Sequence, residues 1–110
     1  MWVFTTSGFL SAVYKDGALQ VRARDRKSLD ALAKETNSSI IATPLADYPY
    51  RIAITNEQFS NWLSQQALAI DYKNFKSEIA DIRGYGFASP LNKVWSVMHE
   101  VEDSKARVRS

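Results

Sequence analysis

The stretch Lys15-Asp16-Gly17-Ala18-Leu19-Gln20-Val21-Arg22-Ala23-Arg24 decides the fold of this chain. Its Asp16-Gly17 pair is typical of a two-residue hairpin turn, because a type I′ turn needs a positive φ at both central positions. Beyond the turn, every second residue from Leu19 to Ala23 is apolar, which is the period of a strand buried on one side. The stretch therefore predicts a β-hairpin with strands over residues 9–15 and 18–24.

Strand patterns continue on both sides of this hairpin. Residues 2–6 are aromatic and β-branched, and they lead through a bend or bulge at Ser7-Gly8 into the first hairpin strand. Further strands are predicted over residues 39–43 and 50–55, with a proline-containing loop between them.

Helical patterns occupy the segment after the hairpin and the second half of the chain. The first predicted helix covers residues 26–36 behind an N-cap at Asp25, and the second begins at a capping box over residues 55–58. A third is predicted over residues 72–83 with Asp71 as its cap, and a fourth begins at Ser89-Pro90. Gly84 and Gly86 predict a helix stop and a flexible connection. The apolar stripes expected on the last three helices comprise Phe59, Trp62, Leu63, Ala67 and Ile70; Phe75, Ile79 and Ile82; and Leu91, Val94, Trp95, Met98 and Val101.

Strands that come first and helices that follow predict an α+β fold. We expect a mainly antiparallel sheet, made of the N-terminal hairpin and two later strands, covered by three to four helices. The length of 110 residues fits one domain, placed over residues 1–103. The polar and basic residues 104–110 predict a flexible tail.

The composition argues against several chemistries. The chain has no cysteine and a single histidine, His99, so thiol nucleophiles, disulfide frameworks and cysteine-rich zinc sites are excluded. A lone histidine is a poor metal site, because zinc takes three or four protein ligands. The sequence therefore predicts no catalytic residue, no metal and no cofactor.

No run approaches the roughly 18 apolar residues that cross a bilayer, and the N-terminus lacks the charged and apolar regions of a secretory signal. We expect a cytoplasmic protein with no membrane partner.

The most distinctive candidate site is the segment Asp47-Tyr48-Pro49-Tyr50-Arg51. Tyr48, Tyr50 and Arg51 on a rigid backbone are typical of a recognition loop, because aromatic rings bind at a low entropy cost. The alternative is an ordinary entry into a strand, in which a tyrosine packs on the sheet edge and Asp47 pairs with Arg51.

The densest basic cluster consists of Arg22, Arg24, Arg26 and Lys27, and it suits an anionic partner such as nucleic acid. The alternative is a solvated strand face with interspersed charges of both signs.

Five short motifs taken together resemble a family of small uncharacterised proteins of actinobacteria and their phages. These motifs are Trp2-Val3-Phe4-Thr5 with Gly8-Phe9, Val21-Arg22-Ala23-Arg24-Asp25, Asp47-Tyr48-Pro49-Tyr50-Arg51, Asn74-Phe75-Lys76 and Val94-Trp95-Ser96-Val97-Met98. The resemblance implies an intracellular, phage- or prophage-encoded domain and brings no activity or site residue with it.

Three functions follow as hypotheses. The first is a non-enzymatic interaction module for a protein partner, a second copy of the chain or another protein, with an exposed aromatic patch containing Trp2, Tyr48 or Tyr50. The second is nucleic-acid binding through the basic cluster, which requires its members to share one face. The third is a small enzyme without metal or thiol chemistry, which needs a pocket with convergent polar groups.

Overall fold

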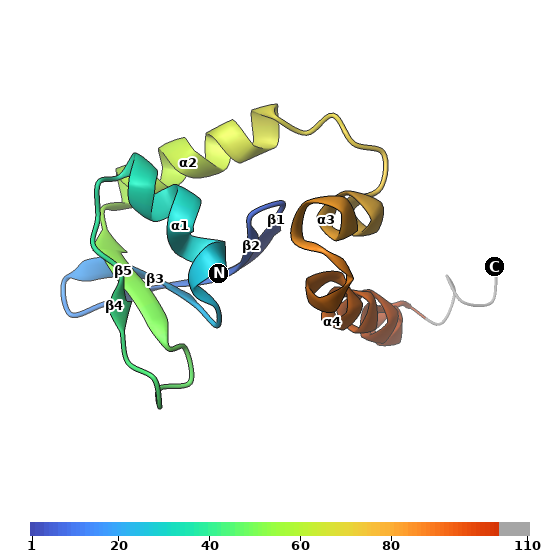
Figure 1. Cartoon of the computed structure of the whole chain (residues 1–110), viewed down its shortest axis with the longest axis horizontal. Coiled ribbons are helices and arrows are strands. Elements are labelled where there is room, and N and C mark those ends of the chain that lie inside the picture. Colours follow the sequence, from blue (N-terminus) through green and yellow to red (C-terminus); the bar gives the residue numbers. More distant parts are fainter. Residues whose placement is uncertain (104–110) are drawn as a thin grey trace. The chain divides into compact units, whose positions relative to one another are not determined.

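A computed structural model describes residues 1–103, and the contacts within the chain divide it into two units (Figure 1). The first unit covers Met1–Lys73, and the second begins at Asn74. The expectation that residues 1–103 act as one domain stays a prediction, and the predicted tail over residues 104–110 lies outside the described residues.

The first unit contains the strands and two helices. In chain order its elements are β1 (Trp2–Thr5), β2 (Gly8–Lys15), β3 (Ala18–Ala23), α1 (Arg26–Glu35), β4 (Ile41–Ala42), β5 (Tyr50–Ile54) and α2 (Asn56–Leu68). All neighbouring strands are antiparallel, in the order β1-β2-β3-β5-β4. The predicted α+β fold with an antiparallel sheet is confirmed.

The hairpin turn that decides the fold has the predicted conformation. Asp16 and Gly17 have φ angles of 54° and 78°, as a type I′ turn requires. The predicted bend at Ser7-Gly8 is instead a chain reversal, because β1 pairs with β2 from Thr5 opposite Gly8 outward. The expected strand over residues 39–43 is reduced to Ile41–Ala42.

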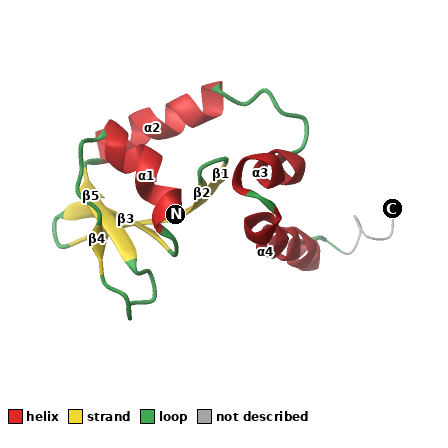
Figure 2. Cartoon of the chain, in the orientation of Figure 1, coloured by secondary structure: helices red, strands yellow, loops and turns green. Residues whose placement is uncertain are grey.

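Helices α1 and α2 cover one face of the sheet and enclose the core of the first unit (Figure 2). The largest core side chains that are 2% exposed or less are Leu10, Val21, Leu29, Leu32, Ile52 and Trp62. Burial of each such aliphatic side chain contributes about 1.5–3 kcal/mol to folding. Alternate residues of the same strands must therefore point to the opposite face of the sheet.

The start of α2 was predicted correctly, and its end was not. Thr55 and Gln58 form the expected capping box, with both hydrogen bonds present. The helix ends at Leu68, Ala67 is exposed and Ile70 is 56% exposed, so the apolar stripe of α2 stops after Leu63. Asp25 is the N-cap of α1 as predicted, but its carboxylate accepts a hydrogen bond from the Ser28 hydroxyl and caps no backbone N–H.

The second unit contains α3 (Phe75–Arg83), α4 (Tyr85–Val97) and a 3₁₀ turn, η1 (Met98–Val101). The prediction that Asp71 caps a helix beginning at Tyr72 is wrong, because the Asn74 side chain accepts from the Ser77 backbone N–H at 3.1 Å and starts α3 there. The prediction that Ser89-Pro90 starts α4 is also wrong. Gly84, with a φ of 87°, ends α3 and reverses the chain, so α4 begins at once and Pro90 lies inside it.

The apolar stripe predicted on α4 is not buried as a core stripe would be. Val94, Trp95, Met98 and Val101 are between 42% and 71% exposed, whereas Ala88 is the residue of α4 that is buried. Within the same unit, Ile79 of α3 is fully buried and Ile82 is 51% exposed. The packing between α3 and α4 therefore centres on the Ile79 side of α3.

Candidate binding surface on the open side of the sheet

Strand register places five side chains in one row across the sheet, on the side opposite α1 and α2. Directly opposed residues share a face, and the pairings join Trp2 to Ser11, Ser11 to Arg22, Arg22 to Arg51 and Arg51 to Ile41. Phe4 and Phe9 form a second opposed pair on the same side. We call the surface formed by Trp2, Phe4, Phe9, Ser11, Arg22, Arg24, Asp47, Tyr48 and Arg51 the open face.

Three aromatic rings lie at the β1 edge of the open face. Phe4 stacks on Phe9 with ring centroids 4.8 Å apart, and Trp2 meets Phe9 edge-on at 6.0 Å. Phe9 is half-buried between them, whereas Trp2 is 71% and Phe4 38% exposed. Two large rings are thus held in place by a third and keep much of their surface in water.

Tyr48 packs on the open face, and the guanidinium groups of two arginines lie over its ring. The Arg22 and Arg24 guanidinium carbons lie 4.5 and 4.4 Å from the centroid of its ring, and Phe9 lies 6.4 Å away. Tyr48 is only 8% exposed. The expectation of Tyr48 as an exposed recognition residue is therefore wrong, because the ring packs on its own sheet and orients the two arginines.

Arg24 is paired with the carboxylate that precedes this tyrosine. Its Nη1 donates to Asp47 Oδ1 at 3.0 Å and to the Asp47 carbonyl oxygen. This hydrogen bond raises the pKa of Arg24, because the Asp47 carboxylate favours the charged guanidinium. The alternative pairing of Asp47 with Arg51 is wrong, because Arg51 Nη2 donates to Thr43 Oγ1 at 2.9 Å instead.

Arg22 and Arg51 are the unusual feature of the open face. They are directly opposed on β3 and β5, and like charges in that position destabilise a sheet. Arg22 Nη2 donates to Ser11 Oγ at 2.9 Å, while its Nε is buried without a hydrogen-bond partner. Among residues 1–103, neither arginine forms an ion pair with a carboxylate. The row therefore carries two positive charges that no carboxylate of residues 1–103 pairs with, and their hydrogen bonds turn Arg22 toward β2 and Arg51 toward Thr43.

The other candidates from the sequence lie elsewhere. Tyr50 is opposite Ala23 and packs partly buried against the core, on the side of the helices. Arg26 and Lys27 are exposed on α1, where Arg26 is 4.0 Å from Asp30. The predicted basic cluster thus divides, with Arg22 and Arg24 on the open face and the other two on a helix that covers the opposite side.

Sequence reasoning missed Phe4, Phe9 and Ser11 as members of the site. Phe9 and Ser11 stand at the positions of β2 that alternate with the core residues Leu10 and Ala12. The sequence shows this alternation, but it does not show which strand with a polar face pairs beside the strand that carries the aromatic rings.

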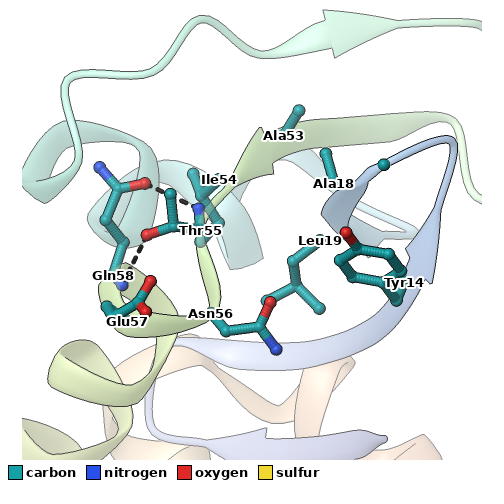
Figure 3. Close-up of a pocket in the computed structure, with 10 residues that line it drawn as sticks. Tyr14, Ala18, Leu19, Ala53, Ile54, Thr55, Asn56, Glu57 and Gln58 are labelled. Atoms are coloured by element: carbon teal, nitrogen blue, oxygen red, sulfur yellow. Dashed lines mark hydrogen bonds between the residues drawn. The ribbon is translucent and has the colours of Figure 1, made fainter.

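The first unit also has an open depression of about 550 Å³ beside the hairpin turn and the start of α2. In Figure 3 the Tyr14 phenol and the Glu57 carboxylate lie at opposite ends of it, and the Thr55 and Gln58 side chains are engaged in the capping box. The lining holds no histidine, lysine or arginine. Its polar side chains are those of Tyr14, Thr55, Asn56, Glu57 and Gln58.

In the second unit the single histidine is engaged with a carboxylate. His99 Nδ1 lies 2.7 Å from Glu102 Oε1, and its ring meets Trp95 edge-on at 4.9 Å. Lys76 Nζ lies 3.7 Å from the centroid of the same Trp95 ring. Through residue 103, no group of three or more His, Asp or Glu side chains is arranged to hold a metal ion.

No protein-family model, curated protein or solved structure gives a significant match to the chain. The resemblance to the actinobacterial and phage family stays a prediction. None of the helices described in residues 1–103 has the length and apolar character needed to cross a membrane.

Proposed function

We propose that this chain is a non-enzymatic interaction module that binds another macromolecule through the open face of its sheet. The observation that carries the proposal is the exposure of Trp2 and Phe4 beside an uncompensated arginine pair, on the side turned away from α1 and α2. Exposed aromatic and arginine side chains dominate the energetics of macromolecular interfaces.

The arrangement of these side chains supports recognition rather than local stability. The Trp2 side chain contributes little hydrophobic free energy to folding, because most of its surface is in water. The opposed pair of Arg22 and Arg51 costs stability. Departures from local rules of this kind are expected at functional sites. We place the module in the cytoplasm, with a phage or prophage origin as the resemblance implies.

Affinity purification from the native host tests the proposed surface. The chain, its Trp2→Ala and Arg51→Gln variants and a matched Lys93→Gln control on α4 are used as baits, and the recovered macromolecules are identified. Lys93 is an exposed residue of the second unit and is not a member of the open face, so its replacement removes one charge without changing that set of residues. We expect a partner that wild type and K93Q retain and that W2A and R51Q lose.

Light scattering of the same four proteins covers self-association. A dimer that is lost in W2A identifies a second copy of the chain as the partner. A partner or dimer that survives both open-face variants overturns the proposal.

A further inference from the structure

We infer that the macromolecule bound by the open face is a single-stranded nucleic acid, with backbone phosphates on Arg22 and Arg51 and bases stacked on Trp2 and Phe4. This inference rests on the proposed function and names the chemical class of its partner.

The charge of the open face favours an anion. It holds Arg22, Arg24 and Arg51 against one carboxylate, Asp47, which is hydrogen-bonded to Arg24. Two guanidinium groups that have no carboxylate partner within residues 1–103 present planar donors that match the oxygens of a phosphate. A phosphate bound by either guanidinium offsets its positive charge and lowers the repulsion between the two residues.

The arginines are held in position before any ligand arrives. Arg22 is fixed by its hydrogen bond to Ser11 and by stacking on Tyr48, and Arg51 is fixed by its hydrogen bond to Thr43. Each of these hydrogen bonds uses one Nη2 atom of its guanidinium. Apart from the buried Nε of Arg22, the remaining donors can bind a ligand at a lower ordering cost than those of free side chains.

The aromatic edge favours unpaired bases. Neutral rings exposed beside arginines provide stacking surfaces that every base can use, whereas the base faces in a duplex are already stacked on each other. Trp2 lies in the same row as the arginine pair, two strands from Arg22 and three from Arg51. With strands about 4.8 Å apart, Trp2 and Arg51 are roughly 14 Å from each other across the sheet, so a short nucleic-acid strand can cross the face from β1 to β5.

Fluorescence anisotropy with labelled oligonucleotides tests this inference on the full chain. The probes are a single-stranded oligo(dT) and an oligo(U) of about 15 nucleotides and a DNA duplex of the same length, each measured at low and at physiological salt. We expect both single strands to bind more tightly than the duplex. The ratio between oligo(dT) and oligo(U) shows whether DNA or RNA is preferred.

Variants of the open face are expected to change the affinity for single strands in opposite directions. W2A weakens binding by about fivefold to 100-fold, the effect of losing one base–aromatic stack. R51Q weakens binding and lowers the slope of log affinity against log salt by about 0.7, because one phosphate contact is lost. D47N strengthens binding, because it removes the one carboxylate of the face and retains an oxygen that can accept from Arg24.

A matched charge change away from the face is the control. Lys34 is exposed on α1, which covers the opposite side of the sheet, and K34Q is expected to leave the affinity within about twofold of wild type. Circular dichroism of each variant establishes that it is folded before its affinity is measured.

The outcomes separate this inference from the proposed function. Absence of single-strand binding at low salt, equal binding of the duplex, or an equal loss in K34Q and R51Q overturns the nucleic-acid inference. If the host purification then yields a protein that W2A loses, the open face remains an interaction surface with a protein partner. If neither nucleic acid nor protein depends on Trp2 and Arg51, both proposals fall.

Discussion

Replacement of Tyr48 by leucine tests whether this ring organises the arginines of the open face. Leucine keeps an apolar side chain at the site but removes the aromatic ring that Arg22 and Arg24 contact at 4.5 and 4.4 Å. Each cation–π contact contributes about 0.5–1 kcal/mol at a site that is partly in water. We therefore expect the free energy of unfolding of the first unit to fall by about 1–2 kcal/mol in Y48L.

Urea denaturation followed by tryptophan fluorescence measures this loss. Trp62 is 2% exposed in the core of the first unit and reports its unfolding, while a Trp95→Phe background removes the signal from α4. With a dependence on urea of about 1.5 kcal/mol/M, the expected loss shifts the midpoint by roughly 1 M. Y48F keeps the ring and is expected to stay within about 0.5 kcal/mol of wild type.

A double-mutant cycle separates the contribution of Arg22 from that of general packing. In an Arg22→Gln background, Y48L should cost less than in wild type by the share of one contact, about 0.5–1 kcal/mol. Two results would show that the Tyr48 ring does not hold these arginines and that the description of the open face is wrong. The first is equal stability of Y48L and Y48F, and the second is the same loss of unfolding free energy from Y48L in wild type and in the Arg22→Gln background.

Four further predictions concern the fold. Gly17→Ala should lower the stability of the first unit in thermal melts by about 1–2 kcal/mol, because Gly17 has a φ of 78° that alanine disfavours, while an added Cβ meets no atom within 4 Å. Gly86→Ala, inside α4, should raise the stability of that helix in thermal melts by up to about 1 kcal/mol. Asn74→Ala should lower the stability of α3 by about 1 kcal/mol by circular dichroism while Asn74→Asp preserves it, and equal losses in the two variants count against the cap. Trp62→Ala should cost about 3–5 kcal/mol and abolish cooperative unfolding of the first unit, whereas a loss below about 1 kcal/mol shows that α2 does not close this core.

The features of this fold that can be predicted from the sequence are those that depend on residues close together in the chain. The Asp16-Gly17 turn, the alternation along β3 and the Thr55 capping box each depend on residues that are adjacent or nearly adjacent in the chain. The errors occur where two local signals compete. Asn74 rather than Asp71 caps α3, and the reversal at Gly84 starts α4 before Ser89-Pro90 can do so.

The candidate site was only partly predictable for a related reason. Arg22, Arg24 and Arg51 were recognised as candidates, but their surroundings were not, because the role of an arginine depends on what lies across the sheet from it. Tyr48 is buried and Tyr50 faces the core although the two residues are separated by one proline.

What the sequence by itself determined is the content of the two faces of each strand, since side chains alternate with a period of two wherever a strand forms. The tertiary structure alone decided that Arg22 of β3 meets Arg51 of β5 and that Trp2 joins their row. The physical reason is register. The pairing of β3 with β5 is set by the packing of Val21 and Ile52 beneath the helices, and the arginines on the other side take whatever neighbours that packing brings.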